Sequence, residues 1–299
     1  MTTHTNQHRH RHRDSIQQQD ETALADLLDL DAEVLGSHLD EIVGWTAEWI
    51  VEQDAAHPRV LADLGAGTGS GTLALARRFP AADIICIDQS PLMLERLRTT
   101  TRSRGVADRV RLVEADLDVG WPDVGAVDLA WAALSLHHVN QPGTLLGELH
   151  DALAANGLLV VVEMDALPRF LPDDIGLGQP GLERRCHQAA ALQQWNAHPD
   201  WRLPLQDAGF QVVAQRTFSV DVPSPPPSAR RYAHAMLSRM RSALADRLSA
   251  IDRQTLDRLL SDDDSESVLS RRNLMLRSSR TAWAAQRLSE SSPARRKAD

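Results

Sequence analysis

A glycine-rich segment between a short apolar run and an amphipathic stretch constrains this chain more than any other feature of its sequence. The segment, GAGTGSG, covers residues 65–71 and follows the apolar run RVLADL at 59–64. Glycines at alternate positions let the backbone turn tightly from a strand into a helix and let a ligand approach it closely. One such turn is a weak signal by itself, so its meaning depends on the rest of the chain.

Strand-like and helix-like segments alternate after the glycine segment. Each strand-like segment is a short apolar run, as expected for strands that are buried on both faces of a sheet. The helix-like segments carry apolar residues at helical spacing, and Pro91 opens one of them. This alternation implies a parallel sheet covered by helices on both faces. The expected strands are 59–64, 83–88, 109–116, 126–134 and 158–164, and the expected helices are 70–79, 91–101 and 143–153.

The second half of the chain is less regular. Residues 180–208 are typical of helix, and 210–222 alternate between apolar and polar residues like a half-exposed strand. The proline-rich segment at 223–228 interrupts the pattern, two helices are expected over 228–261, and 273–287 is typical of a final strand. We therefore predict an α/β fold with a doubly wound, mostly parallel sheet and a helical insertion before the last strand.

The composition changes at the N-terminal end of the chain. Residues 1–20 are polar, which favours a disordered tail, although alternating histidines can also chelate a metal ion. These histidines are His4, His8, His10 and His12. Amphipathic helices are expected over 21–35 and 38–54. The predicted organisation is a His/Arg-rich disordered tail at 1–20, N-terminal cap helices at 21–55, an α/β core at 56–222, a helical insertion or lid at 223–270, the last strand at 271–288 and a disordered tail at 289–299.

Composition and charge exclude several classes of protein. Of the 299 residues, 42% are hydrophobic, so a large core can form. The formal net charge of −9 disfavours binding to a phosphate backbone, so no nucleic-acid partner is expected. The sequence shows neither a membrane span nor a secretory signal, and its two cysteines, Cys86 and Cys186, suit reduced thiols. We expect a cytoplasmic protein with no membrane partner.

Three aspartates lie at the ends of expected strands, on the edge where such sheets bind ligands. Asp88 ends the second strand, where a carboxylate accepts hydrogen bonds from both hydroxyls of a ribose. Asp116 ends the third strand, where an adenine edge would lie. Asp63, two residues before Gly65, would repel a pyrophosphate and attract an ammonium ion. The residues alone therefore favour a cationic nucleoside over a dinucleotide such as NAD.

The motifs that carry these residues resemble those of the class I S-adenosylmethionine-dependent methyltransferases. VLADLGAGTGSG resembles the first motif of the family, IICIDQSPLMLERLR the second-strand motif and VRLVEADL the third-strand motif. VDLAWAALSLHHV and LHDALAANGLLVVVEM resemble the fourth and fifth strand motifs, so the resemblance covers about 57–164. It implies S-adenosylmethionine as cofactor, a small-molecule methyl acceptor, and a Rossmann-like seven-stranded sheet whose last strand is antiparallel. The stretch 223–270 departs from the minimal pattern of the family.

By this resemblance, Asp88 would bind the ribose and Asp116 the amino group of adenine, with Leu117 beside the ring. The residues that follow Asp88 would flank the adenosine, namely Gln89, Ser90 and Met93. The predicted cofactor-binding residues are Asp63, Gly65, Ala66, Gly67, Gly69, Asp88, Gln89, Met93, Asp116, Leu117 and Ala132. No metal site is predicted.

The methyl acceptor would meet residues at the fourth and fifth strands. His137 and His138 follow the fourth strand, and histidine is suited to remove a proton near neutral pH. The resemblance places the first of the pair nearer the acceptor, so His137 is the candidate catalytic residue, and a structural role for both stays open. Glu163 would orient a polar acceptor or simply end the fifth strand. Trp131 would offer its ring to a cation or lie in the core.

Helices that close over a site suit a small acceptor. The N-terminal helices and the insertion are expected to form this cover, with Tyr232, His234 and Arg241 lining the pocket or lying on a solvated face. Two other functions stay open. An NAD-dependent oxidoreductase is disfavoured by Asp63 and by the lack of a Tyr-x-x-x-Lys pair, because the only lysine is Lys297. A non-catalytic S-adenosylmethionine-binding regulator would carry the same cofactor motifs.

Overall fold

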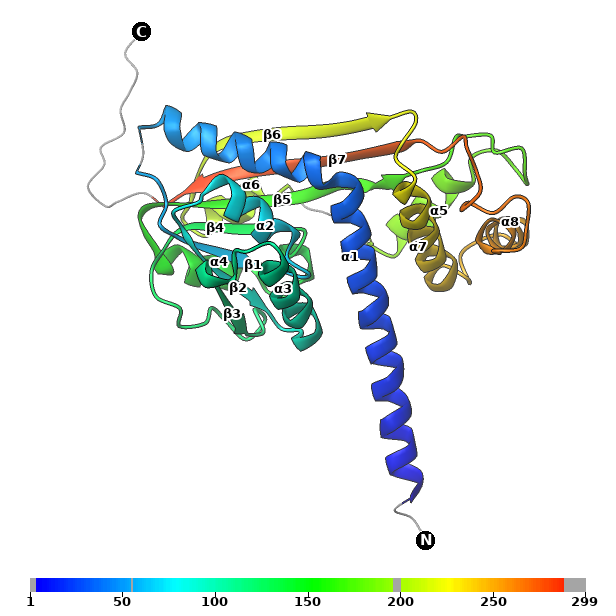
Figure 1. Ribbon diagram of the computed structural model, residues 1–299, viewed down its shortest axis with the longest axis horizontal. Coiled ribbons are helices and arrows are strands. Elements are labelled where there is room, and N and C mark those ends of the chain that lie inside the picture. Colours follow the sequence, from blue (N-terminus) through cyan, green and yellow to red (C-terminus); the bar gives the residue numbers. More distant parts are fainter. Residues whose placement is uncertain (1–3, 55, 196–199, 288–299) are drawn as a thin grey trace.

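The computed structural model describes residues 4–54, 56–195 and 200–287, with side chains from residue 19 onward. Its strands are β1 (Val60–Leu64), β2 (Asp83–Asp88), β3 (Val110–Glu114), β4 (Val127–Ala133), β5 (Leu153–Arg169), β6 (Gln211–Val222) and β7 (Leu276–Gln286). They form one seven-stranded sheet in the order β3-β2-β1-β4-β5-β7-β6 (Figure 1). β7 is antiparallel to both of its neighbours, and the other pairs are parallel. The prediction of a doubly wound, mostly parallel sheet is confirmed.

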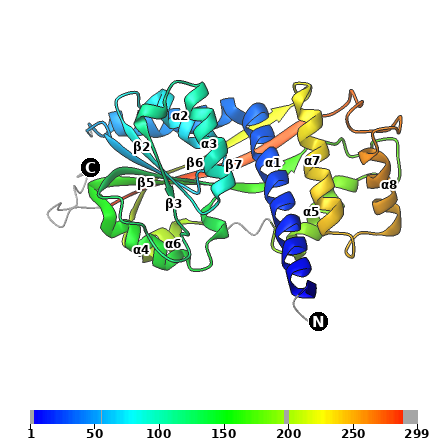
Figure 2. The same cartoon turned by 60° about the horizontal axis from the view of Figure 1, so that its bottom comes forward.

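Two layers of helices cover the core of this sheet. β2 and β4 bury most of their residues, as expected of strands covered on both faces. The helices α2 (Ser70–Arg78) and α3 (Pro91–Ser103) pack on one face, and α4 (Pro142–Ala152) and α6 (Arg202–Asp207) pack on the other (Figure 2). Because β1, β2, β4 and β5 are parallel, their carboxyl ends meet at one edge, which is where sheets of this kind bind ligands.

Three long strands carry the sheet into a second helical region. Figure 1 shows β5, β6 and β7 extending beyond the core toward α5 (Leu182–Leu192), α7 (Ser228–Ala243) and α8 (Ala250–Leu260). These helices enclose an apolar cluster of their own, in which the rings of Phe170 and Tyr232 meet edge to face at 5.0 Å. α7 and α8 are the helical part of the segment predicted as an insertion.

The N-terminal part of the chain differs from its prediction. One helix, α1 (His4–Glu52), replaces the disordered tail and the two separate helices that were expected there. No proline precedes Pro58 and no glycine precedes Gly36, so no residue of the sequence stops the helix from propagating toward the N-terminus. Residues 1–3 and the tail predicted at 289–299 lie outside the described residues, as do the side chains of the N-terminal histidines.

α1 bends near its middle instead of ending there. Figure 1 shows its first half projecting away from the sheet and its second half lying along β6. Leu35 packs into the second helical region, whereas Leu39 packs onto the sheet. Gly36 and Ser37 lie between them, and such a pair lets a helix bend without losing its continuity. α1 therefore contacts both regions of the fold.

The third strand is shorter than predicted. β3 ends at Glu114, so Asp116 lies two residues beyond the strand that it was expected to end. The Asp116 carboxylate accepts a hydrogen bond from the Asp118 amide at 2.9 Å. An aspartate that binds the backbone two residues further on favours a turn, and this turn competes with continuation of the strand.

Both cysteines, Cys86 and Cys186, are buried free thiols, as predicted. Burial raises the pKa of the Cys186 thiol to about 12, so the group stays protonated and unreactive near neutral pH. Within the described parts of the chain, no helix is long and apolar enough to cross a membrane.

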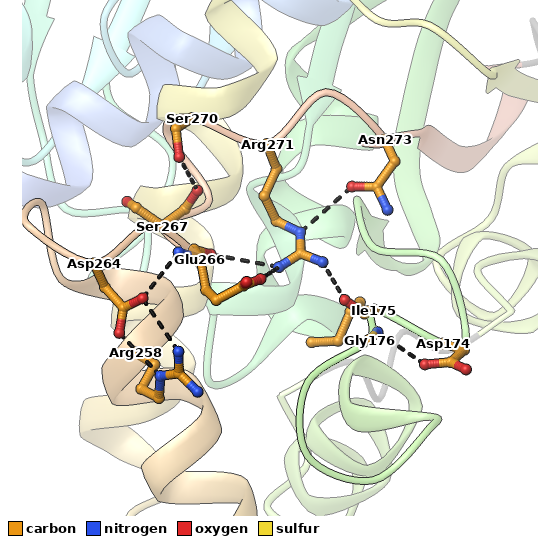
Figure 3. Close-up of polar contacts among 10 residues, drawn as sticks. All are labelled: Asp174, Ile175, Gly176, Arg258, Asp264, Glu266, Ser267, Ser270, Arg271 and Asn273. Carbon is orange, nitrogen blue, oxygen red and sulfur yellow. Dashed lines mark hydrogen bonds and ion pairs between the residues drawn. The ribbon is translucent and has the colours of Figure 1, made fainter.

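An arginine secures the connection between α8 and β7 (Figure 3). Arg271 donates hydrogen bonds to the carboxylate of Glu266 at 2.8 Å and to Asn273 at 3.4 Å. Its guanidinium also donates to the carbonyl of Ile175, which lies in the connection between β5 and α5. One side chain, 9% exposed, therefore ties together two segments that lack regular structure.

Arg271→Ala is expected to lower the free energy of unfolding by about 2 kcal/mol, since hydrogen bonds that involve a charged group are worth about 1.5–3 kcal/mol. Urea unfolding measures the change. Arg272→Ala is the matched control, because the neighbouring Arg272 is exposed and surface substitutions change stability by about 0.5 kcal/mol or less. Equal effects of the two substitutions would contradict the assigned role of Arg271.

Candidate functional site

The glycine segment forms a tight loop between β1 and α2. Gly65, Gly67 and Gly69 have positive φ angles of 63°, 54° and 99°. A Cβ on Gly65 would lie 2.6 Å from the Cβ of Ser135, and a Cβ on Gly69 would lie 2.9 Å from Leu97. Only glycine fits at these two positions, so the loop presents bare backbone at the ligand-binding edge of the sheet.

The end of β2 holds this loop in place. The amide of Ala66 donates a hydrogen bond to the Ile87 carbonyl at 3.0 Å. The Asp88 carboxylate accepts hydrogen bonds from the amides of Gly67 at 2.8 Å and Ser90 at 2.9 Å. Burial raises the pKa of Asp88, and the two amide hydrogen bonds oppose the rise. Since a carboxylate offers about four acceptor positions, Asp88 has capacity for further hydroxyl donors at the predicted ribose position.

Asp63 is buried beneath the first turn of α2. Its side chain is 3% exposed, and its carboxylate accepts a hydrogen bond from the Thr72 hydroxyl at 2.7 Å. Burial raises the pKa of Asp63 above its ordinary value of 3.8 to about 6. The carboxylate thus supports the helix that follows the glycine loop, and its contact with an ammonium group stays a prediction.

The raised pKa of Asp63 predicts a pH-dependent stability. The folded protein binds this proton more tightly than the unfolded chain, so the stabilisation is present at low pH and is lost as the pH rises through about 6. Asp63→Asn should remove this dependence, because the amide is neutral at every pH. Urea unfolding gives the free energy of unfolding of each protein. The value for Asp63→Asn minus that for wild type should rise by about 2 kcal/mol between pH 4.5 and pH 7.5. A constant difference would show that Asp63 has the same pKa in both states.

Five further predicted cofactor residues lie on β4 or shortly after β2 and β3. They are Gln89, Met93, Asp116, Leu117 and Ala132. Met93 and Ala132 are buried, Leu117 is half-buried, and Gln89 and Asp116 are exposed. Their contacts with a cofactor stay predictions.

The end of β4 brings a histidine next to a buried carboxylate. Leu134 has a φ of 57°, which is uncommon for leucine, and its amide donates to the Val162 carbonyl of β5 at 2.8 Å. A short 3-10 helix (Leu136–His138) follows. Within it, Nδ1 of His137 lies 2.8 Å from Oε2 of Glu163, whose side chain is 1% exposed. Glu163 therefore orients the imidazole of His137.

This histidine–carboxylate pair adjoins the glycine loop. Ser135, two residues before His137, lies against Gly65. The Oγ of Ser135 is buried, and within the described residues it has no hydrogen-bond partner. Buried polar groups of proteins are rarely left unsatisfied, so such a hydroxyl is a candidate for contact with a ligand. The β1–α2 loop and the end of β4 thus form a single site.

The pairing distinguishes the two ring nitrogens of His137. An ionised carboxylate only accepts hydrogen bonds, so the histidine tautomer that can donate to an ionised Glu163 is the one with its hydrogen on Nδ1. The lone pair of the neutral ring is then on Nε2. A histidine oriented in this way by a carboxylate acts as a general base in other enzymes. From the sequence, His137 and Glu163 are separate candidates for contact with the acceptor. The sequence does not indicate that they form a pair.

Four other candidates from the sequence have structural roles. Trp131 is fully buried in the core on the α2 side of the sheet, so its ring is not exposed to a cation. His234 lies 3.2 Å from a carbonyl oxygen of α8, and Arg241 forms an ion pair with Asp257 of α8 at 2.7 Å. Tyr232, 2% exposed, donates its hydroxyl hydrogen to a carboxylate of α1. These three residues join α7 to its neighbours.

The N-terminal helices were expected to cover the acceptor pocket, but the contacts of α1 with the predicted cofactor site were not predicted. Oε1 of Glu21 accepts a hydrogen bond from the Ser90 hydroxyl at 2.5 Å. The side chain of Leu28 lies next to Gly67 in the glycine loop. Apolar periodicity indicates a packed helix in this part of the chain, but it does not indicate which loop the helix covers.

Part of this chain is similar in sequence to known methyltransferases. Residues 62–161 match the model of a family described as a methyltransferase domain. A demethylmenaquinone methyltransferase of Thermus thermophilus is 37% identical over 38% of this chain and 50% of its own length. A malonyl-[acyl-carrier protein] O-methyltransferase of Laribacter hongkongensis is 34% identical over 53% of this chain and 50% of its own. A trans-aconitate 2-methyltransferase of Methylobacterium radiotolerans is 36% identical over 43% and 46%.

The sheet order, the glycine loop after β1 and the family match define a methyltransferase domain. Over residues 62–161, this domain is similar to those of the class I S-adenosylmethionine-dependent methyltransferases. The chain spans about half the length of the curated relatives it matches.

Proposed function

We propose that this protein transfers a methyl group from S-adenosylmethionine to a hydroxyl oxygen of a small molecule. The main support for the proposal is that the glycine loop and the His137–Glu163 pair lie next to each other at one edge of the sheet. The loop suits a nucleoside, and the pair suits removal of a proton from an acceptor. The methyltransferase relatives support the same class of reaction.

The residues of the chain fit a bound nucleoside. The glycine loop offers backbone without side chains, Asp88 offers carboxylate oxygens beside it, and the buried hydroxyl of Ser135 has hydrogen-bonding capacity. S-adenosylmethionine, when bound, supplies a methyl group that is activated by a sulfonium. The protein then has to orient the acceptor and exclude water. α1 contributes to that exclusion, since Leu28 lies over the loop at Gly67.

His137 is the proposed acceptor of the proton. A neutral hydroxyl is a poor nucleophile, and it loses its proton as the new bond to oxygen forms. Nε2 of His137 takes this proton, and the buried carboxylate of Glu163 stabilises the positive charge that develops on the ring. A carboxylate acceptor carries no proton near neutral pH, so dependence on His137 distinguishes a hydroxyl acceptor from a carboxylate acceptor.

Two measurements test the proposed function in sequence. Calorimetric titration with S-adenosylmethionine, S-adenosylhomocysteine and NAD should show micromolar binding of the two adenosyl ligands only. A screen with labelled methyl should then give a methylated product from a panel of small hydroxylated compounds. Carboxylic acids belong in the panel, because trans-aconitate and malonyl groups appear in the names of relatives. Binding of NAD alone would contradict the proposal, and binding without any product would favour a regulator.

A further inference from the structure

The first half of α1 carries several carboxylates, and four of them pair with arginines of α3, β7 and α7. The pairs are Asp26 and Asp29 with Arg96, Asp31 with Arg280, and Glu33 with Arg231. Glu21 differs from these four, because no cation lies within ion-pair distance of it among the side chains that the structure describes. Its carboxylate instead accepts the hydrogen bond from the Ser90 hydroxyl.

This hydrogen bond places a second carboxylate beside the predicted ribose position. The amide of Ser90 donates to Asp88 at 2.9 Å, and its hydroxyl donates to Glu21 at 2.5 Å. The two carboxylates repel each other, and the charge of Glu21 adds to the burial that raises the pKa of Asp88. A neutral diol carries two hydroxyl donors, so it can bind both carboxylates without adding charge.

The same part of the helix covers the glycine loop. The Cδ1 atom of Leu28 lies 3.2 Å from the position of a Cβ on Gly67. Leu28 follows Glu21 by seven residues, and this spacing places both side chains on one face of the helix. That face therefore touches the loop at Gly67 and the end of β2 at Ser90, which are the two elements that define the nucleoside site.

We propose that Glu21 is a cofactor-positioning residue and that its contact with the bound nucleoside holds α1 over the site. The inference rests on the proposed binding of S-adenosylmethionine. Glu21 accepts a hydrogen bond from a ribose hydroxyl alongside Asp88, and Leu28 then separates the glycine loop from solvent. The ion pairs of α1 with Arg96, Arg280 and Arg231 fix this part of the helix to both regions of the fold.

The test measures ligand binding to the full-length protein rather than turnover. Glu21→Ala is expected to weaken binding of S-adenosylmethionine and S-adenosylhomocysteine about 10-fold, as the loss of one hydrogen bond to a charged group predicts. Alanine favours helix, so α1 should stay folded. Asp20→Asn is the matched control, because Asp20 is the exposed neighbour on the same helix. In wild type, S-adenosylhomocysteine should slow amide hydrogen exchange over 21–35, and Glu21→Ala should lose most of this protection.

Other outcomes overturn the inference and separate its failure from that of the proposed function. If Glu21→Ala binds both ligands like wild type while Asp88→Ala loses them, Glu21 does not position the cofactor, and the proposed function stands. Tighter binding by Glu21→Ala would show that α1 obstructs the site instead of covering the bound ligand. Failure of wild type to bind either ligand would overturn both proposals.

Discussion

Replacing Asp88 with alanine is expected to weaken binding of S-adenosylmethionine about 100-fold. The substitution removes the acceptor of the predicted ribose hydrogen bonds, and each hydrogen bond to a charged group is worth about 1.5–3 kcal/mol. It also removes the carboxylate that holds the amides of Gly67 and Ser90, so the glycine loop loses its anchor to β2. A loss of about 3 kcal/mol corresponds to about 100-fold in the Kd, which calorimetric titration measures directly.

A control for Asp88 lies on the same strand. Asp83 is exposed at the opposite end of β2, so Asp83→Ala should bind the ligand like wild type. Asp88→Asn should give an intermediate Kd, because the amide keeps one acceptor oxygen. Thermal unfolding of each variant distinguishes lost binding from a lost fold. Wild-type affinity in a folded Asp88→Ala variant would place the nucleoside elsewhere on the protein.

The core of the fold could be predicted because its signals are local. The strand expected at 83–88 has the same bounds as β2, and the helix expected at 70–79 ends one residue beyond α2. A buried parallel strand is a continuous apolar run, and a glycine turn is visible in a few residues. The loop and Asp88 lie close together in the sequence, so this half of the site follows from a single segment.

The rest of the site depends on contacts between distant segments. His137 and Glu163 are 26 residues apart, and they meet because β4 and β5 are neighbours in the sheet. Glu21 and Ser90 are 69 residues apart, and their contact requires α1 to cross the ligand-binding edge. No local pattern specifies either pairing. The polar composition of residues 1–20 is typical of disorder, and it does not reveal that the helix continues to His4.

Replacing His137 with alanine is expected to lower kcat by about 100- to 10,000-fold, which is the usual contribution of a positioned general base. The Kd for S-adenosylmethionine should stay unchanged, because the proposal assigns His137 to the acceptor and the nucleoside contacts to the glycine loop and Asp88. Transfer of labelled methyl to the acceptor found by screening measures kcat, and calorimetry measures the Kd. Loss of both would indicate that the substitution disturbs the loop through Ser135.

Three further variants separate proton transfer from structure. Glu163→Gln keeps the shape of the side chain and removes its charge, so its kcat should lie between those of wild type and His137→Ala. If Glu163 acts only through His137, the double variant should be no slower than His137→Ala, because residues that act as a unit have non-additive effects. His138→Ala is the matched control, since the His138 ring lies 4.0 Å from the His137 ring in the same 3-10 helix, and it should keep most of the turnover. Full turnover of His137→Ala would mean that the acceptor loses its proton to another base or reacts as a carboxylate. In either case, the mechanism proposed for the His137–Glu163 pair would be wrong.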